Sequence, residues 1–375
     1  MPDLRIAALI PAAGMSSRMK AFKPLLDLGG QTFIERAVRL FETAGVTDVV
    51  TVIGHRRGDL MPVLARTVCR WVFNPHYRDG MFTSVQQGAR ELHRSCDAFF
   101  VLPVDTPLVR PLTVRHLMEA YARRSPLICY PRFMDRRGHP PLIDSRLIDE
   151  MLTYRGGGGL RAFLARHGDR AETVPVADAY IGMGANTRED LEALRKALPR
   201  HTIPSPEECQ VLLTHHFSVS PAIEGHSRAV AGVARRLGNA LNDCGRSYDL
   251  DLLTAGGLLH DICKGQKGHA DRAAVILREA GFPEVAGIVA EHMVLRPRGD
   301  DEIDEASLLY LADRMVQDDQ VVSLDMRRSA MMEKYARNGP IRRLISERFQ
   351  AAETILARIE AVVGRQVESI LSEGR

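Results

Sequence analysis

The spacing of apolar residues changes near residue 198, and this change constrains the fold more than any other feature of the chain. Before it, short β-rich runs alternate with amphipathic helical patterns. The predicted strands are 4–10, 48–53, 70–73, 98–104 and 127–130, and the predicted helices are 32–44, 82–93 and 113–123. Because such alternation favours parallel strands joined by helices, we expect an α/β, Rossmann-like domain with a mostly parallel sheet. Ligands should gather at the C-terminal ends of its strands.

A proline-rich segment separates this half from the next. Residues 199–206 contain three prolines in eight positions, and proline disfavours helix at its own position and at the one before it. Beyond this segment, apolar residues recur at three- and four-residue spacing, which predicts helices at 222–241, 250–262, 270–280 and 306–316. The sequence therefore predicts an α/β domain at 1–198, a linker at 199–206 and an all-α domain at 207–375.

The bulk composition is typical of a globular protein and argues against several other classes. A chain of 375 residues is too long for one ordinary core, which suggests two domains. The net charge of +3 does not by itself indicate a nucleic-acid partner. No apolar run approaches the roughly 20 residues that cross a bilayer, and the N-terminus lacks the design of a signal peptide. Six scattered cysteines without a C-x-x-C pair are typical of reduced thiols, so we expect a cytoplasmic protein.

The end of the first predicted strand has the chemistry of a triphosphate site. The apolar run 6–10 leads into a turn of small residues, 12–14, where a backbone can approach a ligand closely. Two cations, Arg18 and Lys23, follow this turn. Main-chain N–H groups in such a turn can point at anionic oxygens, and the cations neutralise the remaining charge. The alternative is an ordinary strand-to-helix turn with surface cations.

A carboxylate stands where a metal would bind at the same edge of the sheet. The apolar run 98–104 ends at Asp105, which is followed by a proline turn. A metal is needed where the α-phosphate of a triphosphate is attacked, and Mg²⁺ prefers one or two carboxylates together with phosphate oxygens. Taken alone, Asp105 could equally be a residue that caps the next helix. Together with the turn at 12–14, it indicates a catalytic metal site.

These segments together resemble the nucleotidyltransferases of the molybdopterin-dinucleotide type. The opening motif of that family is matched in order by Ala12, Ala13, Gly14, Ser16 or Ser17, Arg18, Met19 and Lys23. Lys20 departs from it, because the family usually has glycine there. Further family segments are resembled by residues 74–85, which hold Gly80 and Ser84, by 137–142 around His139, and by 183–191 around Asn186.

The resemblance implies a role for each matched position. The nucleotide-binding residues are Ala12, Ala13, Gly14, Ser16, Gly80 and Ser84. The catalytic residues are Arg18, Lys23 and Asp105, and the ligands of Mg²⁺ are Asp105 and Asn186. The acceptor-binding residues are His139 and Arg161.

The resemblance also implies CTP as the nucleotide and a molybdopterin-type cofactor as the acceptor. The Ala12-Ala13-Gly14 form is that of the family's cytidylyltransferases, whereas its guanylyltransferases usually carry a second glycine. The acceptor's terminal phosphate would attack the α-phosphorus in line, and pyrophosphate would leave without a covalent enzyme intermediate. A molybdoenzyme or its insertion chaperone is then the expected downstream partner. Thr106 and the glycine-rich segment 155–161 depart from the family's sequence, so a sugar or polyol phosphate stays open as the acceptor.

The helical half resembles the HD-domain phosphohydrolases, whose metal ligands come from separate helices. The ligands that this resemblance implies are His226, His260, Asp261 and Asp313, with His269 and His292 added in the dinuclear subgroup. Lys264, in the sequence His-Asp-Ile-Cys-Lys, is the implied catalytic residue. Imidazole and carboxylate ligands suit Fe, Mn, Co, Ni or Zn. The dinuclear subgroup includes hydrolases of dinucleoside polyphosphates.

Two alternatives stay open for this half. It could act as a nucleotide- or metal-sensing module that regulates the transferase without hydrolysis, and His269 or His292 could orient a phosphate instead of binding metal. Residues 341–371 lie outside the resemblance, and their helical pattern predicts packing or an oligomer contact. The oligomeric state itself is not predicted.

Overall fold

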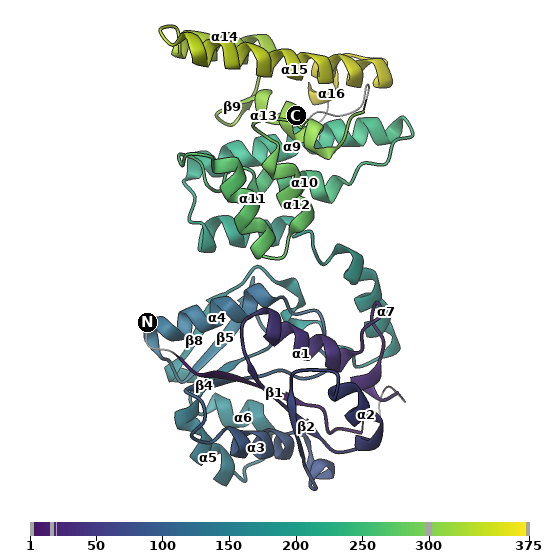
Figure 1. The fold of residues 1–375 in the computed structure, drawn as a ribbon, viewed down its shortest axis with the longest axis vertical. Helices are drawn as coiled ribbons and strands as arrows, with labels where there is room; N and C mark the ends of the chain where they lie inside the picture. The colour runs from purple at the N-terminus through teal and green to yellow at the C-terminus, as the bar shows by residue number, and fades with distance from the viewer. Residues whose placement is uncertain (1–3, 16–18, 20, 297–301, 373–375) are drawn as a thin grey trace. The chain divides into compact units, whose positions relative to one another are not determined.

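The structure is a computed structural model that describes residues 4–15, 19, 21–296 and 302–372. It divides into two compact units, Met1–His201 and Thr202–Arg375. Figure 1 shows strands and helices mixed in the first unit and helices predominating in the second. Both halves of the fold prediction are confirmed, since the first unit holds a mixed, mostly parallel sheet and the second is helical.

The sheet of the first unit has eight strands in the order β3-β2-β1-β4-β7-β5-β6, with β8 paired to β5. Its strands are β1 Ile6–Pro11, β2 Asp48–Ile53, β3 Arg70–Phe73, β4 Ala98–Val101, β5 Ile128–Phe133, β6 Arg136–Arg137, β7 Leu142–Asp144 and β8 Ala171–Pro175. Strands β1, β2, β3 and β4 pair in parallel, whereas β7 runs antiparallel between β4 and β5. The sequence did not predict β6, β7 or β8. Strands β6 and β7 are only two and three residues long, so they have no periodicity of their own.

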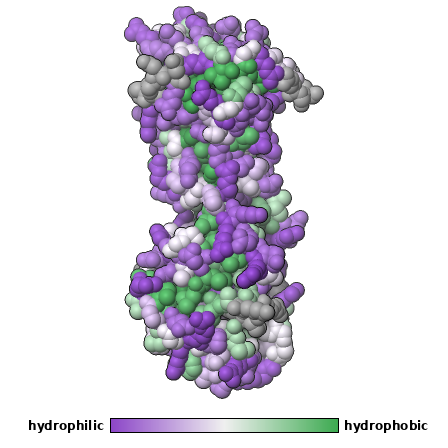
Figure 2. All heavy atoms as spheres, turned by 90° about the vertical axis from the view of Figure 1, so that its right-hand side faces the viewer, coloured by the Kyte–Doolittle hydropathy of each residue, from purple (hydrophilic) through white to green (hydrophobic). Residues whose placement is uncertain are grey.

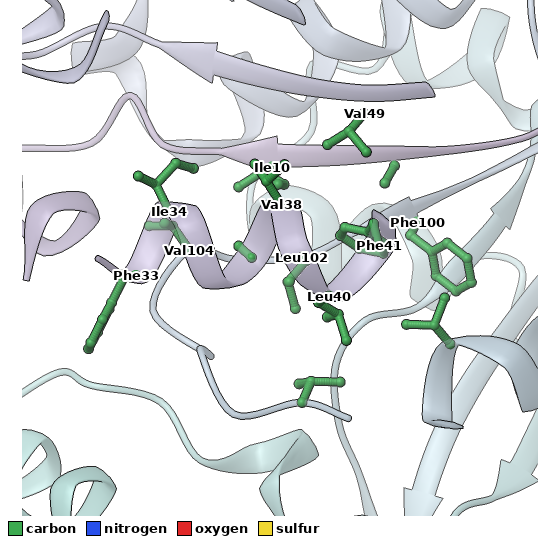
Figure 3. Close-up of a cluster of buried hydrophobic side chains, with 14 of the residues drawn as sticks. Ile10, Phe33, Ile34, Val38, Leu40, Phe41, Val49, Phe100, Leu102 and Val104 are labelled. Atoms are coloured by element: carbon green, nitrogen blue, oxygen red, sulfur yellow. The ribbon is translucent and has the colours of Figure 1, made fainter. Parts of the chain in front are cut away.

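Helices cover both faces of this sheet (Figure 1). They are α1 Phe33–Thr43, α2 Arg57–Leu64, α3 Met81–Leu92, α4 Pro111–Arg124, α5 Ile148–Thr153, α6 Gly159–Ala165 and α7 Arg188–Ala197. Alternate residues of β1 enter different cores, since Ile10 belongs to the cluster under α1 and Leu9 to the cluster under α3. This follows from the two-residue period of a strand. In the first cluster Phe41 of α1 lies 5.6 Å from Phe100 of β4, measured between ring centroids (Figure 3).

Strand β4 is shorter than the apolar run that predicted it. Residues 98–104 were expected to be extended up to Asp105, but the strand ends at Val101. Leu102 still donates its N–H to Leu9 O at 3.0 Å. Pro103 has no N–H and cannot continue the ladder, so the chain turns and Asp105 lies in a turn above the strand.

Part of the proline-rich segment belongs to the first unit. The carbonyl of His201 accepts hydrogen bonds from Arg110 Nε at 3.1 Å and Nη2 at 3.0 Å. The His201 imidazole lies 2.8 Å from Leu108 O. Helix α8, Pro206–Val211, then begins with Ser205 as its N-cap. The irregular connection is therefore shorter than residues 199–206.

The second unit is built from helices. They are α8, α9 Pro221–Asp243, α10 Leu250–Leu259, α11 His269–Glu279, α12 Pro283–Ala290, α13 Glu305–Arg314, α14 Leu324–Lys334, α15 Gly339–Val363 and α16 Val367–Ser372. A short antiparallel hairpin, β9 Val316–Gln317 and β10 Gln320–Val321, adds an element that the helical periodicity did not predict. Hydrophilic side chains cover most of the face drawn in Figure 2. Among the described residues, no helix combines the length and the apolar character that crossing a membrane requires.

The contact of α9 with α10 depends on a glycine. A Cβ atom added to Gly257 would lie 2.4 Å from Ala231 Cα and 2.7 Å from Ala231 N, which are backbone atoms of α9. We expect Gly257→Ala to lower the free energy of unfolding by about 1–3 kcal/mol, because the two helices must separate. Chemical denaturation of the variant and the unaltered protein measures this loss.

Gly232→Ala is the matched control for this prediction. Gly232 lies in α9, where an added Cβ would be 4.0 Å from its nearest neighbour, Arg236 Nη2. Since alanine favours helix over glycine by roughly 1 kcal/mol, this control should leave stability equal or higher. Equal stability of the two variants would show that α9 and α10 are not packed as closely as described.

Candidate active sites

The turn after β1 forms the floor of a cavity in the first unit. Ala12 donates its N–H to Val52 O at 2.9 Å, and Ala13 O accepts from His55 N at 3.0 Å, so the turn is tied to the end of β2. Gly14 has open space where a side chain would be. The cavity has a volume of about 300 Å³. Residues predicted from the sequence to bind the nucleotide or to act in catalysis line this cavity, namely Ala12, Ala13, Gly14, Lys23, Gly80, Ser84 and Asp105.

Lys23 connects two predicted metal ligands. Its Nζ donates to Asp105 Oδ2 at 2.7 Å and to Asn186 Oδ1 at 2.9 Å. Lys23 and Asp105 are 82 residues apart in sequence, and Asn186 lies 163 residues beyond Lys23. The predicted residues Arg18 and Ser16 lie outside the described residues.

Main-chain hydrogen bonds hold Asn186 beside Asp105. Ala185 donates its N–H to Asp105 O at 2.9 Å, and Asn186 donates its own N–H to Asp190 Oδ2 at 2.8 Å. The Asp190 side chain also belongs to the capping box that begins α7 at Thr187. The start of α7 therefore fixes where the Asn186 amide points.

The oxygens around Lys23 are chemically suited to a magnesium ion. A carboxylate oxygen and an amide oxygen are hard ligands of the kind that Mg²⁺ takes, with phosphate oxygens completing its coordination. In the structure the Lys23 ammonium, a cation, lies within hydrogen-bonding distance of both. Asp105 does not cap a helix, because α4 begins at Pro111 with Arg110 as its N-cap.

The segment before α3 forms another wall of the cavity. Buried Asn74 donates from Nδ2 to Ser84 Oγ at 3.0 Å and accepts from His76 N at 2.9 Å. Gly80 has a φ of 106°, which a residue with a side chain rarely adopts. Tyr77 and Arg78 also line the cavity, although neither was predicted from the sequence to be a site residue. Both residues lie inside the family segment 74–85, and this position is the feature of the sequence that could have identified them.

The two predicted acceptor residues differ in their surroundings. Burial lowers the pKa of His139, although the nearby Asp105 carboxylate acts in the opposite direction. Its Nδ1 is buried without a hydrogen-bond partner among the described residues. Arg161 is exposed on α6 and is not among the residues that line the cavity. The structure therefore brings His139 close enough to Asp105 for their charges to interact, but neither His139 nor Arg161 is among the residues that line the cavity.

The six predicted metal ligands of the second unit converge from five helices. His226 lies in α9, His260 and Asp261 follow α10, and His269 begins α11. His292 follows α12, and Asp313 lies in α13. Two groups within the described residues could hold a metal ion. The first group is His226, His260 and Asp261, and the second is Asp261, His269 and His292.

Asp261 belongs to both groups, with one oxygen facing each. Its Oδ2 lies 3.4 Å from His260 Nε2 and 3.7 Å from His226 Nε2. Its Oδ1 lies 3.5 Å from His269 Nε2 and 3.9 Å from His292 Nε2. Asp313 Oδ1 lies 3.1 Å from His226 Nε2 and 3.7 Å from His260 Nε2, which adds a second carboxylate to the first group.

Backbone carbonyls orient three of the imidazoles. Nδ1 lies 2.8 Å from Asp318 O in His226, 2.8 Å from Gly257 O in His260 and 2.7 Å from Val289 O in His292. A proton on Nδ1 would be donated to each carbonyl, which leaves Nε2 as the metal-binding atom. Nε2 of His260 is buried without a hydrogen-bond partner among the described residues. The donor set therefore fits a transition metal.

The electrostatics of this cluster favour a cation. Burial alone would lower the pKa of His260, but the carboxylates of Asp261 and Asp313 raise it to about 10. Burial, and then the charge of His260, lower the pKa of His292 to about 4. One imidazolium is thus held between the carboxylates of Asp261 and Asp313, where a bound metal would supply the positive charge instead.

A second cavity, of about 190 Å³, opens onto these ligands. His226, Asp261, His269 and Asp313 line it together with the predicted catalytic residue Lys264. Lys264 Nζ donates to Asp261 Oδ2 at 2.5 Å. Arg314, also at this cavity, is buried and donates from Nη1 to His292 O at 3.0 Å.

Comparison with known families agrees with the division of the chain into two units. Residues 8–171 match the family described as "MobA-like NTP transferase domain". Residues 223–317 match the family described as "HD domain". The chain combines a nucleotidyltransferase domain of the MobA-like type with an HD domain. Both lie inside the compact units found in the structure.

Individual relatives match about a third of this chain. The protein named "Bifunctional protein GlmU" from Staphylococcus saprophyticus is 30% identical over 114 residues, which are 30% of this chain and 25% of that protein. The chain thus spans about a quarter of the length of this relative.

Solved structures resemble about half of this chain. A nucleotidyl transferase from Methanothermobacter is 24% identical with a TM-score of 0.47, covering 53% of this chain and 99% of that one. "Molybdopterin-guanine dinucleotide biosynthesis protein A" from Archaeoglobus fulgidus is 16% identical with a TM-score of 0.41, covering 52% and 99% of the two chains.

Proposed function

We propose that the first unit transfers CMP from CTP to the terminal phosphate of a molybdopterin-type acceptor and releases pyrophosphate. The observation that carries the proposal is the contact of Lys23 with Asp105 and Asn186 at a cavity whose floor is the turn 12–14. This arrangement places a cation, a carboxylate and the backbone of Ala13 and Gly14 around one volume, with the Asn186 amide oxygen in contact with the cation. Those are the groups that binding a triphosphate requires.

The chain's own residues act by binding and positioning. The backbone of residues 12–14 and the Lys23 ammonium bind the triphosphate, and Asp105 and Asn186 would hold Mg²⁺. When bound, the ion supplies positive charge for the reacting phosphates and for the departing pyrophosphate. An oxygen of the acceptor phosphate forms the new bond to the α-phosphorus as the bond to the β-phosphate oxygen breaks. Since His139 is close to Asp105 and its Nδ1 has no partner among the described residues, we assign it a hydrogen bond to the acceptor.

Pyrophosphate release tests the nucleotide and the acceptor together. The protein is incubated with molybdopterin, Mg²⁺ and each nucleoside triphosphate in turn, and parallel reactions contain sugar or polyol phosphates. We expect release with CTP that depends on molybdopterin. Preference for GTP, or release that needs no acceptor, would contradict this assignment. Acceptor-dependent release with a sugar or polyol phosphate alone would replace molybdopterin but keep the transferase.

We propose that the HD domain is a dinuclear, metal-dependent phosphohydrolase. Asp261 supports this, because each of its oxygens faces a separate pair of imidazoles. The two groups of ligands would each hold a metal ion, and such ions would supply the charge that activates water for in-line attack on a phosphate. The candidate ions are Fe, Mn, Co, Ni and Zn. Phosphate release from CDP-linked and dinucleoside polyphosphate compounds, measured with Mn²⁺, tests the proposal, and binding without release would indicate a sensing module instead.

A further inference from the structure

Helices α14 and α15 close one side of the metal cavity, although they lie beyond the matched HD region, which ends at residue 317. Figure 1 shows both helices in yellow within the second unit. Tyr310 of α13 donates to Arg348 O of α15 at 3.0 Å, so α15 is joined to the helix that carries Asp313. The cavity residues from these two helices are Arg327, Met331, Ile345, Arg348 and Phe349. The expectation of packing or oligomer contact for 341–371 thus omitted a wall of the site.

Two guanidinium groups on this wall lack a carboxylate partner within the part of the chain that the structure describes. Neither Arg327 nor Arg348 forms an ion pair among the described residues, and Arg348 Nε is buried without a hydrogen-bond partner there. Arg328, the neighbour of Arg327, shows the contrast, because its Nη1 lies 3.0 Å from Glu353 Oε1. A guanidinium that is partly removed from water without a counter-ion is unfavourable unless a ligand supplies one.

The other cations of the cavity are already engaged. Lys264 donates to Asp261, and Arg314 donates to backbone carbonyls and lies 3.7 Å from Asp313 Oδ2. Arg327 and Arg348 are therefore the groups left to bind an added anion. Guanidinium matches phosphate oxygens with two parallel hydrogen bonds, which suits phosphate better than other common anions.

We propose that Arg327 and Arg348 form an anion subsite beside the metal centre and bind the phosphoryl group next to the one that is hydrolysed. The substrate would then carry two or more consecutive phosphoryl groups. The inference rests on the phosphohydrolase function proposed above. The cavity volume of about 190 Å³ is smaller than that of an ordinary small-molecule pocket, so it receives the phosphate end of the substrate.

Binding of inorganic pyrophosphate and of inorganic phosphate to the metal-loaded full chain tests this subsite. The variants are Arg327→Gln and Arg348→Gln, and the control is Arg343→Gln, an exposed arginine of α15 that does not line the cavity. Calorimetry should show pyrophosphate affinity lowered roughly tenfold to hundredfold in each cavity variant, since each loses a charge-assisted hydrogen-bond pair. Phosphate affinity, metal content and the affinity of the control should stay unchanged.

Unchanged pyrophosphate affinity in both cavity variants would overturn the subsite, whatever the protein hydrolyses. If Arg348→Gln does not fold, Arg348→Lys replaces it and should lose part of the affinity, because lysine keeps the charge but not the paired geometry. The hydrolase assignment is measured separately by phosphate release from the unaltered protein. Absent hydrolysis with arginine-dependent pyrophosphate binding would support the subsite and refute only the hydrolase.

Discussion

Replacing Asp105 by alanine is expected to abolish nucleotidyl transfer while the first unit stays folded. Asp105 provides the carboxylate that Lys23 contacts at 2.7 Å, and its side chain is only partly buried. Removing it takes away the only carboxylate that lines the cavity of the first unit among the described residues. In the proposed mechanism the metal and the transition-state charge both depend on this carboxylate, so we expect kcat/KM to fall by about 10³-fold or more. Initial rates of pyrophosphate release over a range of CTP concentrations measure the effect.

Asp97→Ala is the matched control for this variant. Asp97 lies just before the same strand, β4, at its opposite end, and its carboxylate pairs with Arg5 at 2.9 Å on the surface. An exposed pair of this kind contributes little to stability, because water and salt screen the two charges, so activity should be retained. Full activity in Asp105→Ala would remove the basis for a metal site in this cavity. Equal loss in both variants would point to a folding defect.

Replacing Asp261 by alanine is expected to remove both metal ions from the HD domain. Its two oxygens each face a different pair of histidines, so neither proposed position keeps its shared ligand. His269→Ala is the comparison, because His269 belongs to one group only. Metal analysis after gel filtration should give about two ions per chain in the unaltered protein, about one in His269→Ala and close to none in Asp261→Ala.

The pH dependence of metal binding checks the same arrangement. The carboxylates of Asp261 and Asp313 raise the pKa of His260 to about 10, so His260 is protonated at neutral pH before a metal binds. Binding must release this proton, and the apparent affinity should therefore rise about tenfold per pH unit below pH 10. In His260→Ala the metal content should fall sharply. Unchanged metal content in Asp261→Ala or in His260→Ala would refute the centre.

Periodicity predicted the long elements well because each carries a pattern of its own. Helix α9 was expected at 222–241 and extends over Pro221–Asp243, and β2 and β3 have the predicted bounds. Strand β6 was missed because its two residues carry no periodicity, and β7 was missed because it exists through pairing with distant residues. Leu142 of β7, for example, pairs with both Phe100 and Cys129. Asp105 was expected directly after its strand, but Pro103 ends the ladder earlier.

By itself, the sequence determined which chemical groups this protein carries and their order, namely a small-residue turn, a carboxylate after an apolar run, and histidines and aspartates in helical segments. Only the tertiary structure decided which of them meet. Lys23 reaches Asn186, 163 residues away, and Arg348 reaches the metal cavity from a helix that follows the HD region. Local periodicity reports how a segment buries its own side chains. Contacts between distant segments depend on how helices and sheet pack, and no single segment encodes that packing.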